Sequence, residues 1–143
     1  MKISDILRSK GSACVTVHPD IPVTEALRTL VEHDIGAVVV VDDTIKGIFT
    51  ERDVLRAAAS DIQRLAHARV RDLMTVDVVT ATPDHDIQHV MNVMTEHRIR
   101  HLPVVAGGEV RGMISIRDVV NALRQTAENE NQQLHAYITG TPL

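Results

Sequence analysis

Two stretches of the chain carry one repeated pattern. They read Gly47-Ile48-Phe49-Thr50-Glu51-Arg52-Asp53-Val54 and Gly112-Met113-Ile114-Ser115-Ile116-Arg117-Asp118-Val119. In each, a short apolar run typical of a strand leads to a hydroxyl residue, one variable residue, an arginine and an aspartate, where a helical pattern begins. Self-similarity at a fixed period is the signature of an internal duplication. The sequence therefore predicts two copies of one small unit.

The duplication extends outward from these two stretches. Residues 16–20 align with 80–84, residues 32–35 with 96–99, and the lead-in residues 3–7 with 70–74. The register slips by one residue at the hairpin turn, which is longer in the second copy. Because nearly every segment has a counterpart, we expect both copies to have the same order of elements.

Each copy is expected to form a strand, a helix, a two-stranded hairpin and a final helix. The predicted strands are 15–17, 37–41 and 45–50 in the first copy, and 78–81, 102–105 and 110–115 in the second. Asp86 is a natural N-cap, and Pro22 suits a first helical turn. A unit of this size cannot bury its apolar face alone. We predict an α/β (α+β) fold of tandem β-α-β-β-α repeats packed with pseudo-twofold symmetry.

Three regions divide the chain on this interpretation. The first repeat with its linker spans residues 1–68, the second repeat spans 69–124, and a helical tail spans 125–143. The linker over residues 57–69 is mostly compatible with helix. The tail is polar at its start and gains Leu134, Tyr137 and Ile138 further on. We expect the tail to dock loosely or to contact a second subunit.

Composition excludes several classes of protein. The chain has 143 residues with 44% hydrophobic residues, one Phe, one Tyr and no Trp, so its core must be aliphatic. A net charge of −4 does not suit a nucleic-acid backbone. The lone Cys14 fits a reducing compartment. The apolar run at 37–41 is too short for a bilayer, and the N-terminus lacks a signal-peptide pattern. We expect a cytoplasmic protein with no membrane or nucleic-acid partner.

The repeated motif at Thr50–Asp53 and Ser115–Asp118 allows two interpretations. In the first, the hydroxyl and the carboxylate cap the N-terminus of the helix that follows. In the second, the helix N-terminus and the hydroxyl bind a phosphate or sugar oxygen, and the carboxylate accepts hydrogen bonds from ribose hydroxyls. Spacing alone favours the capping interpretation.

The repeated Gly-apolar-apolar-Thr/Ser-x-x-Asp motif and the stretch His101-Leu102-Pro103-Val104-Val105 together resemble a pair of CBS domains, the Bateman module. The resemblance covers residues 3–123 and is close to the stand-alone single-pair proteins of this family. It implies a cleft between the two copies that binds an adenosyl ligand. The candidate ligands are AMP, ADP, ATP, NADH and S-adenosylmethionine, with AMP the first choice as a bound effector.

The resemblance also implies roles for particular residues. Asp53 and Asp118 would hold ribose, and Thr50 and Ser115 would contact ribose or phosphate. The remaining candidates are Arg98, Arg100 and His101 for phosphates across the cleft, Arg52 and Arg117 for further positive charge, and Thr16, Thr80, Ile35 and Ile99 on the adenine side.

The two copies differ just before their central strand. The first copy has Asp34, Gly36 and Ala37 where the second has Arg98, Arg100 and His101. Arginine pairs well with phosphate oxygens, whereas a carboxylate repels them. We predict that the Asp53 site, with these cations across the cleft, prefers phosphorylated ligands. The Asp118 site should be weaker or select a different ligand.

The function that these observations favour is a regulatory, non-catalytic nucleotide sensor. No nucleophile–base pattern, phosphate loop or dinucleotide fingerprint is present, so we expect no enzyme activity and no catalytic cofactor. The family resemblance implies a homodimer and a regulated partner protein. A structural dimerisation or interaction module without a nucleotide ligand is the alternative.

His85 and His89 have a spacing that could hold a metal, but surface histidines are the favoured interpretation and we expect no metal.

Overall fold

The computed structural model describes residues 1–11 and 14–139 of the chain. The first copy consists of β1 (Thr16–Val17), α2 (Val23–Glu32), β2 (Ala37–Asp42), β3 (Thr44–Thr50) and α3 (Glu51–Ser60). The second copy consists of α6 (Ile87–His97), β4 (His101–Ala106), β5 (Glu109–Ser115) and α7 (Ile116–Thr139). The lead-in helices are α1 (Ile3–Lys10) and α5 (Val70–Leu73), and α4 (Arg64–His67) lies in the linker. The order of elements matches the predicted repeat except at one strand.

The exception is the predicted strand at residues 78–81. In the first copy β1 pairs in parallel with β2, and β2 pairs antiparallel with β3. In the second copy only β4 and β5 form a sheet, and Ala81 makes an isolated bridge to Val104. The expected strand is therefore wrong for most of its length. The backbone N–H and C=O groups of Thr75 both form hydrogen bonds with the backbone of Ile48 in β3. The segment after Thr75 therefore crosses from the first copy to the second, and only its end reaches β4.

The two hairpins account for the slip in register. In the second copy, Gly107 and Gly108 form the turn with φ of 60° and 77°, a conformation that glycine adopts without a steric penalty. In the first copy, Asp43 alone separates the strands and has a φ of 61°. Both hairpins shift register at matching places, Val40/Val41 and Val104/Val105. The duplication therefore includes the irregularity of each hairpin.

Each lead-in segment packs on the other copy. Ile3, Ile6 and Leu7 of α1 are buried in the core of the second copy. Val70, just before the second copy, is buried in the core of the first. Matching isolated bridges, Lys2 to Asp86 and Pro22 to Arg69, attach the two lead-ins. The copies therefore exchange their first elements, so each core contains residues from both halves of the chain.

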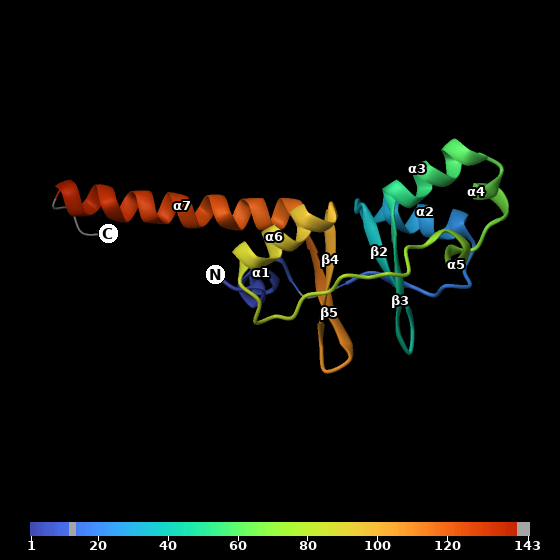
Figure 1. Cartoon of the computed structure of the whole chain (residues 1–143), viewed down its shortest axis with the longest axis horizontal. Helices are drawn as coiled ribbons and strands as arrows, with labels where there is room; N and C mark the ends of the chain where they lie inside the picture. The colour runs from blue at the N-terminus through green and yellow to red at the C-terminus, as the bar shows by residue number, and fades with distance from the viewer. Residues whose placement is uncertain (12–13, 140–143) are drawn as a thin grey trace.

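The two hairpins stand at the centre of the molecule in Figure 1. Helices α2 to α5 lie on the flank of the first copy, and α1, α6 and α7 lie on the flank of the second (Figure 1). The predicted tail is the continuation of α7, which extends well beyond the rest of the molecule (Figure 1). The predicted boundary between residues 124 and 125 falls inside α7. The division into regions 1–68, 69–124 and 125–143 stays a prediction about independent units.

Candidate ligand-binding site

Both hydroxyl–carboxylate pairs cap the helix that follows them. The Thr50 backbone N–H donates to Asp53 Oδ2 over 2.9 Å, and the Asp53 N–H donates to Thr50 Oγ1 over 3.3 Å. Ser115 and Asp118 make the same pair of bonds, at 2.9 Å and 3.2 Å. These bonds satisfy N–H groups that a helix N-terminus leaves without an intrahelical partner. The capping interpretation of the repeated motif is therefore correct, and it leaves ligand binding open.

One pocket, here called the Asp53 pocket, lies between α3 and the residues that precede β4. Its cavity measures about 450 Å³, within the range typical of small-molecule sites. The lining contains four arginines and two histidines against two carboxylates, a strongly cationic set. The residues are Ile48, Thr50, Glu51, Arg52, Asp53, Leu55, Arg56, Thr75, His97, Arg98, Ile99, Arg100 and His101.

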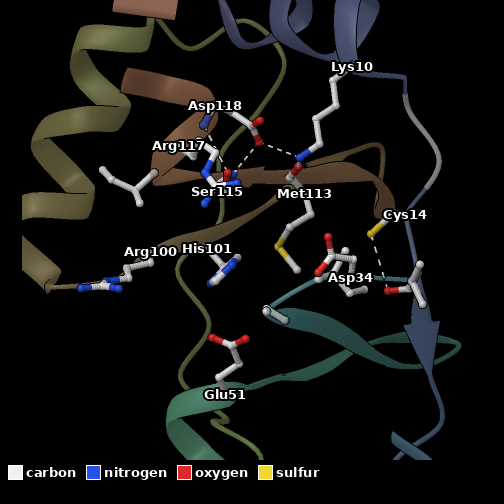
Figure 2. Close-up of a pocket in the computed structure, with 15 residues that line it drawn as sticks. Lys10, Cys14, Asp34, Glu51, Arg100, His101, Met113, Ser115, Arg117 and Asp118 are labelled. Atoms are coloured by element: carbon white, nitrogen blue, oxygen red, sulfur yellow. Dashed lines mark hydrogen bonds and ion pairs between the residues drawn. The ribbon is translucent and has the colours of Figure 1, made fainter. Parts of the chain in front are cut away.

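A second pocket, here called the Asp118 pocket, lies at the corresponding place beside the start of α7. Its cavity measures about 510 Å³. Figure 2 shows Lys10 reaching Asp118 from one side, with Cys14 and Asp34 on another side. This lining mixes acidic and basic groups more evenly. The residues are Lys10, Cys14, Val15, Asp34, Ile35, Gly36, Ala37, Glu51, Arg100, His101, Met113, Ser115, Ile116, Arg117 and Asp118.

The two motif carboxylates have different partners from the lead-in segments. Asp53 is only 7% exposed, and its Oδ1 accepts a hydrogen bond of 2.9 Å from the Thr75 hydroxyl. Asp118 Oδ2 instead lies 2.6 Å from the Lys10 ammonium, which also donates to the Met113 carbonyl. One pocket therefore has a carboxylate bound to neutral donors, and the other has a carboxylate paired with a cation.

Two ionisable groups of the Asp118 pocket, Asp118 and His101, have pKa values shifted by their surroundings. Burial raises the pKa of Asp118, but the hydrogen bonds from Lys10 and Ser115 outweigh it and leave the pKa below its usual value. Burial lowers the pKa of His101, against the opposing effect of Glu51. The lowered pKa favours the neutral form of His101.

The structure gathers most of the predicted site residues into these two pockets. Asp53, Thr50, Arg52, Arg98 and Ile99 line the Asp53 pocket. The Asp118 pocket is lined by Asp118, Ser115, Arg117 and Ile35, and both pockets are lined by Arg100 and His101. Thr16 and Thr80 are exposed and line neither pocket. The roles of all these residues toward a ligand stay predictions.

The sequence analysis missed several pocket residues, and three of them contact or neighbour the motif carboxylates. Lys10 is the last residue of α1, Thr75 lies two residues after α5, and Glu51 is the first residue of α3. The alignment of residues 3–7 with 70–74 could have pointed to the lead-ins, because it shows that they belong to the repeat. Their position beside the carboxylates depends on the exchange between copies, which has no signal in the pattern.

The histidines do not gather into a metal site. His85 and His89 have ring centroids 5.0 Å apart. Among residues 1–11 and 14–139, no group of three or more His, Cys, Asp or Glu side chains could hold a metal ion. Within the same residues, no helix combines the length and apolarity needed to cross a membrane.

A family model agrees with the duplicated architecture. The model described as "CBS domain" matches twice, over residues 3–60 and 70–125. The chain belongs to the CBS-domain family. Its two matches make it a CBS-domain pair, and the pockets lie between the two domains of that pair.

Solved structures of other CBS-domain proteins superpose well on this pair. A CBS-domain protein from Agrobacterium tumefaciens is 42% identical with a TM-score of 0.82, covering 85% of this chain and 98% of that one. The CBS-domain pair of protein MJ0100, solved with 5′-methylthioadenosine and S-adenosyl-L-methionine, is 28% identical with a TM-score of 0.78. That match covers 88% of this chain and 98% of the MJ0100 chain. The fold is therefore that of a CBS-domain pair.

Curated relatives include stand-alone proteins and larger enzymes. The mitochondrial CBS-domain-containing protein CBSX3 of Arabidopsis thaliana is 37% identical over 96% of this chain and 72% of its own length. An inosine-5′-monophosphate dehydrogenase of Nitrosopumilus maritimus is 32% identical over 82% of this chain, but over only 25% of the enzyme. The similarity to that enzyme is thus limited to a small part of it.

Proposed function

We propose that this CBS-domain pair is a non-catalytic regulatory module that binds an adenine nucleotide, AMP foremost, in the Asp53 pocket. The observation that carries the proposal is the placement of arginines around a motif carboxylate in one cavity. Arg52, Arg56, Arg98 and Arg100 line the same space as Asp53. Guanidinium groups bind phosphate in a bidentate geometry, and a carboxylate accepts bonds from ribose hydroxyls.

The hydrogen bonding of Asp53 supports the ribose role. Its carboxylate accepts bonds from the Thr50 N–H, the Thr50 hydroxyl and the Thr75 hydroxyl. A carboxylate has about four acceptor positions, so there is capacity for a further donor from a ligand. The bonds already made fix the orientation of the side chain, which lowers the entropy cost of binding.

The complex of MJ0100 supports the adenosyl part of the ligand. That CBS-domain pair was solved with two adenosyl compounds, neither of which carries a phosphate. The cationic lining of the Asp53 pocket favours a phosphorylated ligand instead, because uncompensated guanidinium groups attract anions. We therefore place AMP before S-adenosylmethionine in this pocket.

Arg98→Gly is the sharpest test of this function. Arg98 has a left-handed backbone with φ of 53°, which glycine adopts without strain, so the variant should fold at least as stably as the wild type. Calorimetry should show AMP affinity reduced about tenfold, the loss expected for one charge-assisted contact. Unchanged affinity in this variant would contradict the assigned phosphate contact.

Asp34→Gly is the matched control. Asp34 has the same backbone conformation, with φ of 51°, but of the two pockets it lines only the Asp118 pocket. AMP affinity at the Asp53 pocket should stay at the wild-type value. ADP, ATP, NADH and S-adenosylmethionine are compared with AMP in parallel. If none of the five ligands binds at millimolar concentration, the sensor function is refuted.

The second candidate function is a dimerisation module, which has its own supporting observation. Leu55 and Val120 occupy matching positions in the two copies, and they are 69% and 46% exposed. A twofold dimer buries the same surface patch on each subunit, and we propose these two exposed side chains as part of that patch. Light scattering tests this dimer. The wild type should be a dimer and Leu55→Lys should be a monomer. A monomeric wild type would contradict the proposed dimer.

A regulatory role requires an output from the occupied pocket. A ligand that touches both copies favours the arrangement in which they approach most closely. We propose that a partner protein reads this change through the paired molecule. We place the activity in the cytoplasm, because a single unpaired cysteine, Cys14, is typical of a reducing compartment.

A further inference from the structure

The two pockets share part of their lining. Glu51, Arg100 and His101 line both the Asp53 pocket and the Asp118 pocket, and we call these three residues the shared wall. Glu51 begins α3 of the first copy, whereas His101 begins β4 of the second and Arg100 directly precedes it. The shared wall therefore joins the two copies as well as the two cavities.

Gly36 keeps the shared wall compact. A Cβ atom on Gly36 would lie 3.3 Å from the Glu51 carboxyl carbon and 3.3 Å from Cε1 of His101. Both side chains thus pack against the same backbone position. Figure 2 shows His101 between the Asp118 side of the cavity and Glu51. Because Glu51 and His101 line both pockets, a charged ligand in either pocket acts on the Glu51 carboxylate and on the His101 imidazole.

The internal duplication does not repeat the residue types of the shared wall at the aligned positions. In the alignment of the two copies, the counterpart of Glu51 is Ile116, and the counterpart of Gly36 is Arg100. The pseudo-twofold symmetry therefore fails at the point where the pockets meet. The two cavities therefore share Glu51, Arg100 and His101 without a matching set at the aligned positions.

The charges outside the shared wall differ between the pockets. The Asp53 pocket keeps three arginines against one carboxylate, whereas the Asp118 pocket keeps two cations against two carboxylates. The groups are Arg52, Arg56, Arg98 and Asp53 in the first, and Lys10, Arg117, Asp34 and Asp118 in the second. Lys10 is already bonded to Asp118. A phosphate in the Asp118 pocket therefore depends on Arg100 and His101 more than a phosphate in the Asp53 pocket does.

We propose that the shared wall couples the two pockets negatively for phosphorylated ligands, so that a nucleotide in the Asp53 pocket leaves the Asp118 pocket to an uncharged nucleoside. This inference rests on the proposed nucleotide binding at the Asp53 pocket. A phosphate there attracts Arg100, and the Glu51 carboxylate is then no longer balanced on the side of the Asp118 pocket. A second phosphate meets that carboxylate and Asp34, whereas adenosine has no charge to be repelled.

Methyl NMR on the full chain can measure each pocket separately. Ile48 lines only the Asp53 pocket of the two, and Met113 lines only the Asp118 pocket. AMP is titrated into the wild type and into Arg98→Glu, which repels phosphate from the Asp53 pocket. The AMP midpoint at Met113 should be at least about fivefold higher in the wild type, within the usual range of site-to-site coupling.

Adenosine provides the uncharged comparison. In the wild type, the adenosine midpoint at Met113 should be the same without AMP and with enough AMP to saturate the Ile48 signal. Equal AMP midpoints at Met113 in the wild type and Arg98→Glu would overturn the coupling alone. An Ile48 signal that ignores AMP in the wild type would refute the proposed function, and this inference with it.

Glu51→Gln tests the shared wall itself. The substitution removes the carboxylate charge but keeps the backbone bond from residue 51 to the Gly36 carbonyl, which measures 3.0 Å. The AMP midpoint at Met113 should fall toward the value found in Arg98→Glu, because two phosphates no longer face an acidic wall. If the AMP midpoint at Met113 in Glu51→Gln stays at the wild-type value, the coupling does not pass through this wall.

Discussion

Lys10 and Thr75 each reach from a lead-in segment to a motif carboxylate, and only Lys10 brings a charge. The Lys10 ammonium lies 2.6 Å from Asp118, and the side chains are 39% and 21% exposed. The Thr75 hydroxyl lies 2.9 Å from Asp53. A partly exposed ion pair is screened by solvent, so its contribution to stability is modest.

Lys10→Met should therefore lower the free energy of unfolding at pH 7 by about 0.5–1.5 kcal/mol. The pKa of Asp118 in the folded state is below its usual value. The contribution of the pair is fully present above the unfolded pKa of about 3.9, and it disappears as the pH falls through the folded pKa. Urea unfolding from pH 7 to pH 2 measures the difference.

Lys46→Met is the control for that experiment, because Lys46 is an exposed lysine on β3, away from both pockets. Its substitution should change the free energy of unfolding little at any pH. If the loss of unfolding free energy in Lys10→Met stays constant down to pH 2, the Lys10 contact contributes through packing rather than through charge.

The two glycines of the repeated motif meet different kinds of neighbour: residues just after α5 approach Gly47 of β3, and a side chain of α1 approaches Gly112 of β5. A Cβ atom on Gly47 would lie 2.6 Å from the Thr75 carbonyl oxygen, a backbone atom. A Cβ atom on Gly112 would lie 2.7 Å from Cδ2 of Leu7, the end of a flexible side chain. A backbone atom cannot move without disturbing its own hydrogen bonds, whereas a leucine tip can change rotamer.

Gly47→Ala should accordingly destabilise the protein by about 1–3 kcal/mol, the usual cost of overpacking. Gly112→Ala should cost less, under about 1 kcal/mol, because Leu7 can adjust. Thermal and urea unfolding of the two variants under one set of conditions provide the comparison. A larger loss for Gly112→Ala would mean that α1 is held more rigidly than α5.

The exchange of lead-ins makes the stability of each copy depend on the other half of the chain. Ile3 is fully buried, and Ile6 and Leu7 are each 7% exposed, all within the core of the second copy. By contrast, residues 127–135 of α7 are exposed. The two ends of the chain should therefore differ greatly in their importance for folding.

Deletion of residues 1–9 should destabilise the second copy strongly, since each buried aliphatic side chain contributes about 1.5–3 kcal/mol. Hydrogen exchange should show the loss of protection in β4 and β5 before β2 and β3. Truncation after Ala127 is the matched deletion, and it should leave the exchange of both hairpins unchanged. Equal loss of protection in both hairpins after the N-terminal deletion would mean that the copies unfold as one unit.

Much of the architecture follows from local patterns. The Gly-apolar-apolar-Thr/Ser-x-x-Asp repeat predicts both strand-to-helix junctions, and Gly107-Gly108 predicts the second hairpin. These features depend on residues a few positions apart, whose backbone preferences and capping bonds act within one segment. The asymmetry between Asp34 and Arg98 could likewise be predicted, because it is a difference in charge at aligned positions.

The sequence by itself determined the duplication, the capped helices and the residue types available to each pocket. Only the tertiary structure decided that α1 packs on the second copy, that Lys10 pairs with Asp118, and that Glu51 and His101 form one wall between two pockets. Lys10 and Asp118 are 108 residues apart. Contacts at such separations depend on how whole elements pack, and no local periodicity encodes them. The same packing left the segment at 78–81 without a full strand.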